Sequence, residues 1–511
     1  MPSLRLVGVE LAHAGQSPIL SDLDLHLAPG WTGVVGANGA GKTTLLELAC
    51  GRRAPSRGRV VRDPDDLQVI VCPQEVGALA ADVAALAVAD DGVARRWRGR
   101  LGCEPAALAR WSTLSPGERK RWQLAAALAA EPDVLALDEP TNHLDRAGRD
   151  ALVAALRGYR GVGLVVAHDR ALLDELCATT LRVHGGRVTA YAGGYQAARA
   201  QWQAEADARR AARADAAAEL RRVERRLDAA RRTEAAASRQ VSTSARMRSR
   251  YDSDARSLGA TTLAAWAAAG AGRTVRRLNR AAAEAADDVA AITVERERGG
   301  ALFVDWEPPH RRWLAALDGV DLRAGDTLLA RDVRRAVARD SRIWITGDNG
   351  AGKTTLVRAL VAAAAVPPDR LLWLPQEPAA GEGAAIQATI RAARPDLRGR
   401  IGQLAAALGL DVAAALGSPA PSPGEVRKLT IALGLARAAW LVVLDEPTNH
   451  LDLPSIERLE AALADYPGAL VLVSHDAQLA GRVTSERWDL SAARPASGRR
   501  PAADGGGRVR T

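Results

Sequence analysis

One segment of nine residues occurs twice in the chain, and it restricts the fold more than any other feature of the sequence. Residues 137–145 read Leu-Asp-Glu-Pro-Thr-Asn-His-Leu-Asp, and residues 444–452 repeat them letter for letter. An apolar run precedes each copy, at 134–136 and 441–443, and is typical of a buried parallel strand. We therefore expect two related α/β domains, each with acidic side chains at the sheet edge where ligands bind.

Each copy begins with a pair of adjacent carboxylates, Asp138-Glu139 and Asp445-Glu446. The aspartate suits a water-mediated contact with magnesium, and the glutamate suits orienting or deprotonating an attacking water. An Asp-Glu pair after an apolar run is more often only a solvated turn. The assignment to catalysis therefore depends on the motifs around each pair.

A glycine-rich loop precedes each copy, at residues 36–44 and 347–355, and fits the phosphate-loop pattern G-x-x-x-x-G-K-[ST]. The first loop follows a strand-like run at 32–35 and opens a helix-like run at 45–48. The glycines let backbone N–H groups face phosphates, the lysine reaches the β and γ phosphates, and the threonine can bind magnesium. The predicted nucleotide-binding residues are Gly36, Asn38, Gly39, Gly41, Lys42, Thr43 and Thr44, and Gly347, Asn349, Gly350, Gly352, Lys353, Thr354 and Thr355.

Three further motifs follow in the same order in both halves. A glutamine after a short apolar run is a candidate for sensing magnesium and the attacking water. A Ser-Pro-Gly-Glu motif opens a helix, expected over 119–130 in the first half, whose N-terminus attracts anions. A histidine ends the last strand-like run. From the serine motif to the histidine the copies lie a constant 307 residues apart, so this part is duplicated without insertion. The candidates are Gln74, Ser115, Gly117, Glu118 and His168, and Gln376, Ser422, Gly424, Glu425 and His475.

Alone, each of these residues would more often be structural: a surface glutamine, a capped helix, a histidine in a sheet. A chain of 511 residues is too long for a single hydrophobic core, and its length suggests about three domains. No apolar run approaches the ~18 residues of a membrane helix, and the N-terminus lacks a signal-peptide core. We therefore expect a soluble, cytoplasmic protein, whose four scattered cysteines, Cys50, Cys72, Cys103 and Cys177, are buried free thiols.

The segment between the two halves differs in composition. It is rich in Ala, Arg and Glu and lacks Gly and Pro from Gln196 through Ser238, which predicts a helix of roughly 40 residues, or ~60 Å. A returning helix is expected over 282–298. Between the helices, residues 239–280 carry nine arginines against two aspartates. With the net charge of +9, a basic hairpin tip favours a phosphate backbone, and RNA is the natural target. A solvated coiled-coil linker is the alternative.

The ordered motifs resemble those of the ATP-binding cassette, over about 1–195 and 310–490. The phosphate loop corresponds to Walker A, the carboxylate pair to Walker B with its catalytic glutamate, and Asp145 and Asp452 to the D-loop. The resemblance implies a head-to-tail sandwich in which the Walker residues of each cassette share a nucleotide with the signature serine, glycine and glutamate of the other. The implied ligands are ATP and Mg²⁺. The catalytic candidates are Glu139, Glu446, His168 and His475, and the magnesium candidates are Thr43, Gln74, Asp138, Thr354, Gln376 and Asp445.

Two cassettes on one chain, signatures that end in glutamate and the absence of a membrane segment resemble the ABC-F family, whose members bind ribosomes. The resemblance implies an α/β fold with two P-loop cassette domains joined by a long α-helical hairpin that reaches toward the peptidyl-transferase centre. Residues 239–280 would then meet rRNA and P-site tRNA, and the cassettes would pair within a monomer. The expected domains are cassettes at 1–195 and 301–490, a linker with a basic tip at 196–300, and a disordered basic tail at 491–511.

Some residues depart from the family pattern. The aromatic residue that commonly stacks on adenine is missing near the first phosphate loop, where His13 is a candidate substitute, and Pro421 precedes the second signature where Leu114 precedes the first. The first cassette also has no room for the extra arm of some translation factors, which favours antibiotic resistance by target protection. A housekeeping translation factor and the ATPase of a drug exporter with separate membrane subunits are the alternatives. A DNA-repair ATPase is disfavoured because zinc-type cysteine pairs are absent, and the sequence does not identify the drug.

Overall fold

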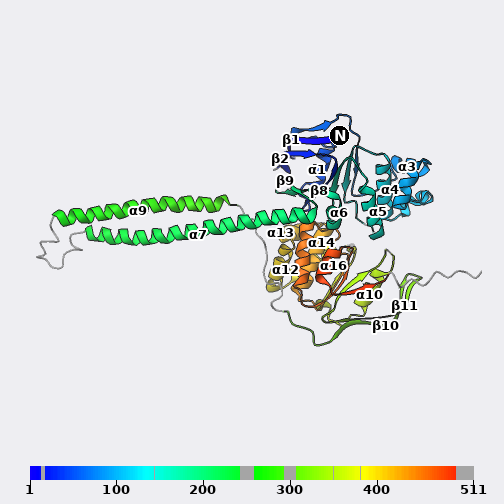
Figure 1. The fold of residues 1–511 in the computed structure, drawn as a ribbon. Helices are drawn as coiled ribbons and strands as arrows, with labels where there is room; N and C mark the ends of the chain where they lie inside the picture. The colour runs from blue at the N-terminus through cyan, green and yellow to red at the C-terminus, as the bar shows by residue number, and fades with distance from the viewer. Residues whose placement is uncertain are drawn as a thin grey trace, which may run out of the picture. The chain divides into compact units, whose positions relative to one another are not determined.

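The computed structural model in Figure 1 describes residues 1–12, 18–142, 144, 146–241, 258–292, 306–348, 350–379 and 381–490. The chain forms two compact units, one of Met1–Ala198 with Arg298–Thr511 and one of Arg199–Glu297. Several sequence predictions lie outside the described residues: those on His13, Asp145 and Asn349, on the arginines at 246, 248, 250 and 256, and on the tail at 491–511.

The first cassette is built on a six-stranded sheet of order β5-β6-β7-β3-β8-β9. Its strands are parallel apart from the antiparallel pair β8 and β9. Every residue of β6 and β7 is buried, as expected for central strands covered on both faces. The strands are β3 (Gly30–Gly36), β5 (Val69–Cys72), β6 (Val134–Asp138), β7 (Val162–Val166), β8 (Cys177–His184) and β9 (Arg187–Ala192).

A second, antiparallel sheet of order β2-β1-β4 shares a hydrophobic core with the parallel strands of this cassette. Helix α1 starts directly after the first phosphate loop, and α4 follows the first Ser-Pro-Gly-Glu serine. The strands are β1 (Ser3–Leu11), β2 (Leu20–Leu27) and β4 (Arg57–Asp63). The helices are α1 (Lys42–Ala49), α2 (Ala81–Val88), α3 (Gly92–Leu101), η1 (Pro105–Thr113), α4 (Pro116–Ala129), α5 (Arg146–Leu156) and α6 (Arg170–Leu176).

The second cassette repeats the plan with a five-stranded, all-parallel sheet of order β13-β14-β15-β12-β16 and an antiparallel pair, β10 and β11. The strands are β10 (Trp313–Ala324), β11 (Thr327–Ala338), β12 (Arg342–Thr346), β13 (Leu371–Leu374), β14 (Leu441–Asp445), β15 (Ala469–Val473) and β16 (Glu486–Asp489). The helices are α10 (Lys353–Ala362), η3 (Pro368–Arg370), α11 (Glu382–Ala392), α12 (Pro395–Ala407), α13 (Val412–Gly417), α14 (Pro423–Ala436), α15 (Leu453–Ala464) and α16 (Ala477–Val483).

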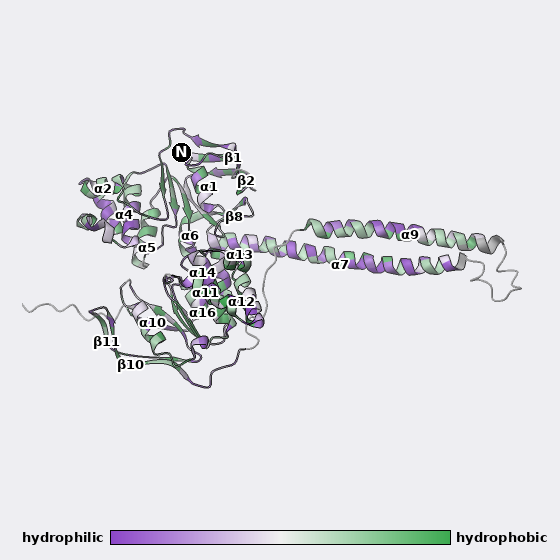
Figure 2. Cartoon of the chain, turned by 180° about the vertical axis from the view of Figure 1, so that it is seen from behind, coloured by the Kyte–Doolittle hydropathy of each residue, from purple (hydrophilic) through white to green (hydrophobic). Residues whose placement is uncertain are grey.

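Two long helices lie between the cassettes in sequence, α7 (Tyr195–Val241) and α9 (Leu258–Ala291). They run side by side in both views (Figures 1 and 2) and carry hydrophilic and hydrophobic residues along their whole length (Figure 2). Arg231 on α7 donates to the side-chain oxygen of Asn279 on α9 at 3.0 Å. The side chains of Val223 and Leu227 on α7 and Val275 on α9 are buried.

The returning helix differs from the prediction, because it begins at Leu258 and not near 282, and ends at Ala291. The observed helix includes glycines at 259, 270 and 272, each of which costs about 1 kcal/mol relative to alanine. Packing against α7 outweighs this cost, and a Cβ at Gly272 would approach Glu234 Oε1 to 3.1 Å. Four arginines assigned to a tip, at 273, 276, 277 and 280, therefore lie on the body of α9.

The predicted fold class is confirmed: the chain is an α/β protein with two P-loop cassettes and a long helical segment between them. No helix among the described residues is long and apolar enough to cross a membrane. All four cysteines are buried and free, also as predicted.

Candidate active site

The first phosphate loop connects the end of β3 to the start of α1, and the second connects β12 to α10. The glycine before each lysine has a left-handed backbone, with φ of +99° at Gly41 and +91° at Gly352. A Cβ at Gly41 would also lie 3.0 Å from Cγ2 of Ile19, and one at Gly352 would lie 2.9 Å from Cδ1 of Leu329. Both the turn and the close packing therefore require glycine.

The loop lysines fold over their own loops. The Lys42 ammonium donates to the carbonyls of Gly36 at 2.9 Å and Ala37 at 3.0 Å, and the Lys353 ammonium donates to Gly347 at 2.7 Å and Asp348 at 3.2 Å. Burial lowers the pKa of Lys42 from its usual value, and the nearby carboxylates Glu139, Asp452 and Asp138 oppose this. A phosphate placed here would supply the countercharge that a buried ammonium needs.

The threonine after each lysine contacts the aspartate at the end of the neighbouring strand. Thr43 donates to Asp138 at 2.8 Å, and Thr354 donates to Asp445 at the same distance. Burial raises the pKa of both aspartates. Among the described residues, the buried Oδ1 of Asp445 has no hydrogen-bond partner. An aspartate oxygen in need of a partner beside a threonine hydroxyl fits the hard oxygen ligands that Mg²⁺ prefers.

The glutamates after these aspartates occupy strained turns, since Glu139 and Glu446 both have φ of +47°. A left-handed backbone costs a residue with a side chain roughly 1–2 kcal/mol and is concentrated at functional sites. Both carboxylates are buried, and burial raises the pKa of each to about 8. A pKa near 8 lies close to the operating pH, the range in which a general acid or base works best.

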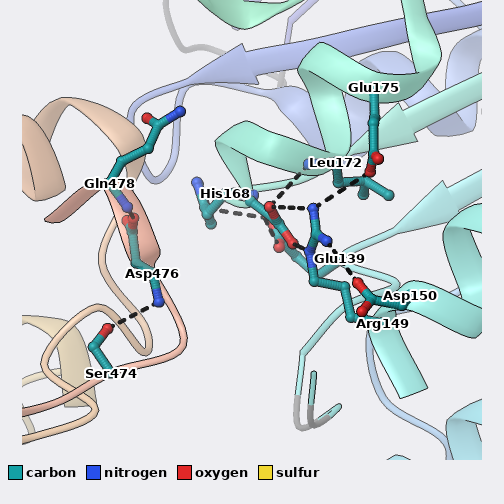
Figure 3. A network of polar contacts seen from close by, with 10 residues as sticks. Glu139, Arg149, Asp150, His168, Leu172, Glu175, Ser474, Asp476 and Gln478 are labelled. Carbon is teal, nitrogen blue, oxygen red and sulfur yellow. Dashed lines mark hydrogen bonds and ion pairs between the residues drawn. The ribbon is translucent and has the colours of Figure 1, made fainter. Parts of the chain in front are cut away.

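A histidine faces each glutamate. His168 Nε2 lies 3.2 Å from Glu139 Oε1 (Figure 3), and His475 Nε2 lies 3.4 Å from Glu446 Oε1. The backbone N–H of each histidine donates to the other oxygen of its glutamate at 3.3 Å. Burial lowers the pKa of His168 to about 3, so its imidazole is neutral near pH 7. The structure therefore brings the two predicted catalytic side chains together in both cassettes.

The predicted signature serines are helix N-caps. Each forms a capping box: Ser115 with Glu118 at the start of α4, and Ser422 with Glu425 at the start of α14. The serine hydroxyls donate to these glutamates at 2.8 and 2.7 Å. The hydrogen bonds from Ser115 lower the pKa of Glu118. A γ-phosphate at either N-terminus would compete with a carboxylate for the same serine.

The glutamines Gln74 and Gln376 lie two residues after the ends of β5 and β13, with exposed side chains. Their backbone carbonyls accept hydrogen bonds from Lys120 and Arg427, respectively. Sequence reasoning missed both cations. The signal that could have found them is their shared place, five residues after each signature serine, with the same spacing of 307 residues.

Contacts between the cassettes link the first phosphate loop to the second D-loop. The Asn38 backbone N–H donates to Asp452 at 2.7 Å, and its side chain donates to the His450 carbonyl at 3.3 Å. A Cβ at Gly424 would lie 2.6 Å from that same carbonyl. The signature glycine of the second cassette thus packs on a segment that touches Walker A of the first. The corresponding Asn349 and Asp145 lie outside the described residues.

The buried glutamates predict a pH-dependent stability difference. The pKa of each glutamate is raised from 4.5 to about 8. The stability that each side chain contributes to the folded protein is therefore complete below pH 4.5 and is lost as the pH rises through 8. The Glu139→Gln/Glu446→Gln variant avoids this loss. It should gain on the order of 4 kcal/mol per site at pH 9 and less than about 1 kcal/mol per site at pH 5, seen as a higher melting temperature without nucleotide and with EDTA. The exposed Glu284→Gln serves as control, and an equal gain at both pH values would contradict desolvation as the cause.

Comparison with known proteins identifies both cassettes. The family model described as "ABC transporter" matches residues 20–142 and 330–449. The chain is 32% identical to the tylosin resistance ATP-binding protein TlrC of Streptomyces fradiae, over 92% of this chain and 94% of that protein. It is 26% identical to the ribosome protection protein VmlR of Bacillus subtilis, over 90% of this chain and 81% of that protein.

It is also 27% identical to the energy-dependent translational throttle protein EttA of Escherichia coli, over 92% of this chain and 89% of that protein. Among solved structures, the archaeal ribosome recycling factor aABCE1, in complex with the stalk protein aP1, matches with a TM-score of 0.59 at 18% identity. This match covers 94% of the present chain and 86% of the aABCE1 chain. It supports the fold alone.

Proposed function

Because the chain belongs to the ABC-F family of tandem ATP-binding cassette ATPases, we propose that it protects the ribosome from an antibiotic. ATP closes the two cassettes on each other, and this places residues 239–280 against rRNA and P-site tRNA near the peptidyl-transferase centre. Hydrolysis then opens the sandwich and releases the protein into the cytoplasm. The resistance proteins among its relatives, including one named for ribosome protection, support this role.

The observation that carries the proposal is a stripe of exposed side chains on α9. Trp266, Arg273, Arg277 and Arg280 are all exposed and are spaced by seven, four and three residues, which places them on one helix face. The buried Val275 lies on the opposite face. Arginines spaced along a helix suit a phosphate backbone, and an exposed indole suits base stacking.

At the first site, the proposal assigns the triphosphate to the loop from Gly36 to Thr44, with Lys42 over the β and γ phosphates. The signature residues Ser422, Gly424 and Glu425 would complete the site from the second cassette. The contacts of Asn38 with Asp452 and with the His450 carbonyl support this pairing. At the second site, the loop from Gly347 to Thr355 and the signature of Ser115, Gly117 and Glu118 play the same parts.

Water attack on the γ-phosphorus requires a base and a fixed direction of approach. Glu139, held in a strained turn and faced by His168, takes the proton from the water at the first site, as Glu446 does beside His475 at the second. Magnesium would be held by Thr43, Asp138 and Gln74 in one cassette and by Thr354, Asp445 and Gln376 in the other. When bound, it neutralises charge on the phosphates.

A housekeeping translation factor is the second candidate, supported by the match to EttA. The higher identity to TlrC over nearly the whole of both chains favours resistance instead. If the chain were the ATPase of an exporter with separate membrane subunits, the exposed tryptophan and arginines on α9 would have no ligand to bind.

Cell-free translation separates these functions. With tylosin added until synthesis falls by about 90%, the protein and ATP should restore most of it, while changing drug-free synthesis little. Erythromycin should be tested in parallel, because both drugs are taken from the names of relatives. Restored synthesis with any of these drugs supports protection. A change in drug-free synthesis with no rescue supports the translation factor, and neither effect supports the exporter.

The stripe on α9 makes a specific prediction. Trp266 is 78% exposed, and losing one base stack costs about 1–3 kcal/mol, or roughly 5- to 100-fold in affinity. Trp266→Ala should therefore raise the protein concentration needed for half-maximal rescue by about that factor, with unchanged ATPase activity. Trp313, which is 49% exposed on β10, provides the matched control Trp313→Ala. Equal effects of the two substitutions would count against an RNA contact through α9.

A further inference from the structure

A buried cation occupies the same position in each signature helix. Lys120 on α4 and Arg427 on α14 lie five residues after their signature serines, and their exposures are 3% and 0%. Neither makes an ion pair with any described residue. Burial lowers the pKa of both, and nearby carboxylates oppose this only in part. Burying a charge without a paired carboxylate is expensive, so these positions need another explanation.

Both cations bind backbone carbonyls of the glutamine loop and of the Asp-Glu turn in their own cassette. Lys120 Nζ donates to Pro73 at 2.6 Å, to Gln74 at 3.3 Å and to Asp138 at 3.3 Å. One contact therefore reaches the glutamine loop, and another reaches the peptide that joins Asp138 to the catalytic Glu139. A charge-assisted hydrogen bond to that carbonyl fixes the peptide plane before the strained glutamate.

The second cassette makes the same connection with a different side chain. Arg427 Nη1 donates to the Glu446 carbonyl at 3.1 Å, and Nη2 donates to the Gln376 carbonyl. Lysine and arginine differ in length and geometry, yet both reach the glutamine loop and the carboxylate turn. What the two cassettes share is a buried cation that joins the glutamine loop to the Asp-Glu turn, through the Asp138 carbonyl in the first cassette and the Glu446 carbonyl in the second. This argues for a role in holding the loop and the turn together.

We propose that Lys120 and Arg427 are positioning residues for ATP hydrolysis. Each ties the glutamine and the catalytic glutamate of its own cassette to the signature helix. Given the proposed sandwich, that helix serves the nucleotide of the opposite site. The cation therefore connects the γ-phosphate contact at one site to the water-activating groups at the other, which lets the two sites respond to each other.

The test measures hydrolysis at one site at a time, without ribosomes. In a Glu446→Gln background only the first site hydrolyses, and Lys120→Met should lower kcat by at least about tenfold, as substitutions of supporting groups often do. The KM for ATP should stay within about threefold, because the phosphate loop is untouched. Lys120→Arg should restore most of the rate, since Arg427 joins the glutamine loop to the Asp-Glu turn in the other cassette.

A matched control is Arg121→Met, which removes the neighbouring cation of α4, whose contact is the Leu101 carbonyl at 3.3 Å. It should leave kcat unchanged. If Lys120→Met is not recovered folded, the shorter and uncharged Lys120→Gln replaces it, with the same expected loss. In a Glu139→Gln background, where only the second site hydrolyses, Lys120→Met should still lower kcat, by about threefold.

Three results would overturn the positioning role: a normal kcat for folded Lys120→Met, a failure of Lys120→Arg to recover activity, or an equal loss in Arg121→Met. A loss at the first site without any effect at the second would leave positioning intact and remove the coupling between sites. Because the assay needs neither ribosomes nor drug, its outcome is separate from that of the translation assay.

Discussion

Glutamine in place of both Glu139 and Glu446 is expected to lower ATP hydrolysis by about 10²- to 10⁴-fold, the usual contribution of a general base. ATP binding should persist, since the phosphate loops and their lysines are unchanged. The variant should therefore accumulate in the ATP-bound, closed state. If that state binds ribosomes, the protein should sediment with them when ATP is present and stay in the supernatant without it.

Two control variants show whether retention depends on nucleotide binding and on the helical linker. Lys42→Ala/Lys353→Ala should abolish retention, because the triphosphate loses its ammonium contacts at both sites. Removing residues 239–280 should abolish retention and leave nucleotide binding intact. If the Glu139→Gln/Glu446→Gln variant stays in the supernatant with ATP and is recovered with membranes instead, the result supports the exporter hypothesis.

The local parts of the site could be predicted from the sequence, because each depends on a few neighbouring residues. The phosphate loops need glycines with left-handed backbones before a lysine, and Gly41 and Gly352 have them. The signature serines are helix caps because Ser-Pro-Gly-Glu encodes a capping box within four residues. The carboxylates end buried strands because continuous apolar runs precede them.

Features that depend on distant contacts could not be predicted. The start of α9 depends on packing against α7, which leaves no local pattern in the sequence around residue 258. Lys120 was passed over because its acceptors are backbone carbonyls, which leave no trace in the side-chain pattern. The partners of Arg170 lie about 300 residues further along the chain, and no periodicity or spacing connects them.

Arg170 shows that the contact between the cassettes is not symmetric. It lies two residues after His168, at the start of α6, and pairs with Glu460 at 2.8 Å and Asp476 at 3.0 Å in the second cassette. At a spacing of 307 residues its counterpart is Ala477, which cannot form an ion pair. In the first cassette, Asp169 pairs with Arg149 of its own domain at 2.5 Å.

This asymmetry predicts a large effect of one substitution. Arg170 is 7% exposed and Glu460 is 6% exposed, and breaking a buried ion pair typically costs 3–5 kcal/mol, because a charge stays buried without its partner. In Arg170→Met, both Glu460 and Asp476 lose their ion pair with Arg170, while Glu460 keeps its ion pair with Arg482 at 2.9 Å. The cassettes should then lose cooperativity, and calorimetry should resolve two unfolding transitions, or one at a clearly lower temperature.

The cost of leaving a buried charge without its partner also defines a control variant and a double variant that should restore stability. Arg157→Met removes an exposed ion pair with Glu175 and should change stability by less than about 1 kcal/mol. Arg170→Met/Glu460→Leu removes both buried charges and should recover most of the loss, since apolar replacements of buried pairs are often neutral. If the double variant is no more stable than Arg170→Met alone, the loss does not come from the stranded carboxylate of Glu460, and the contact works through packing instead.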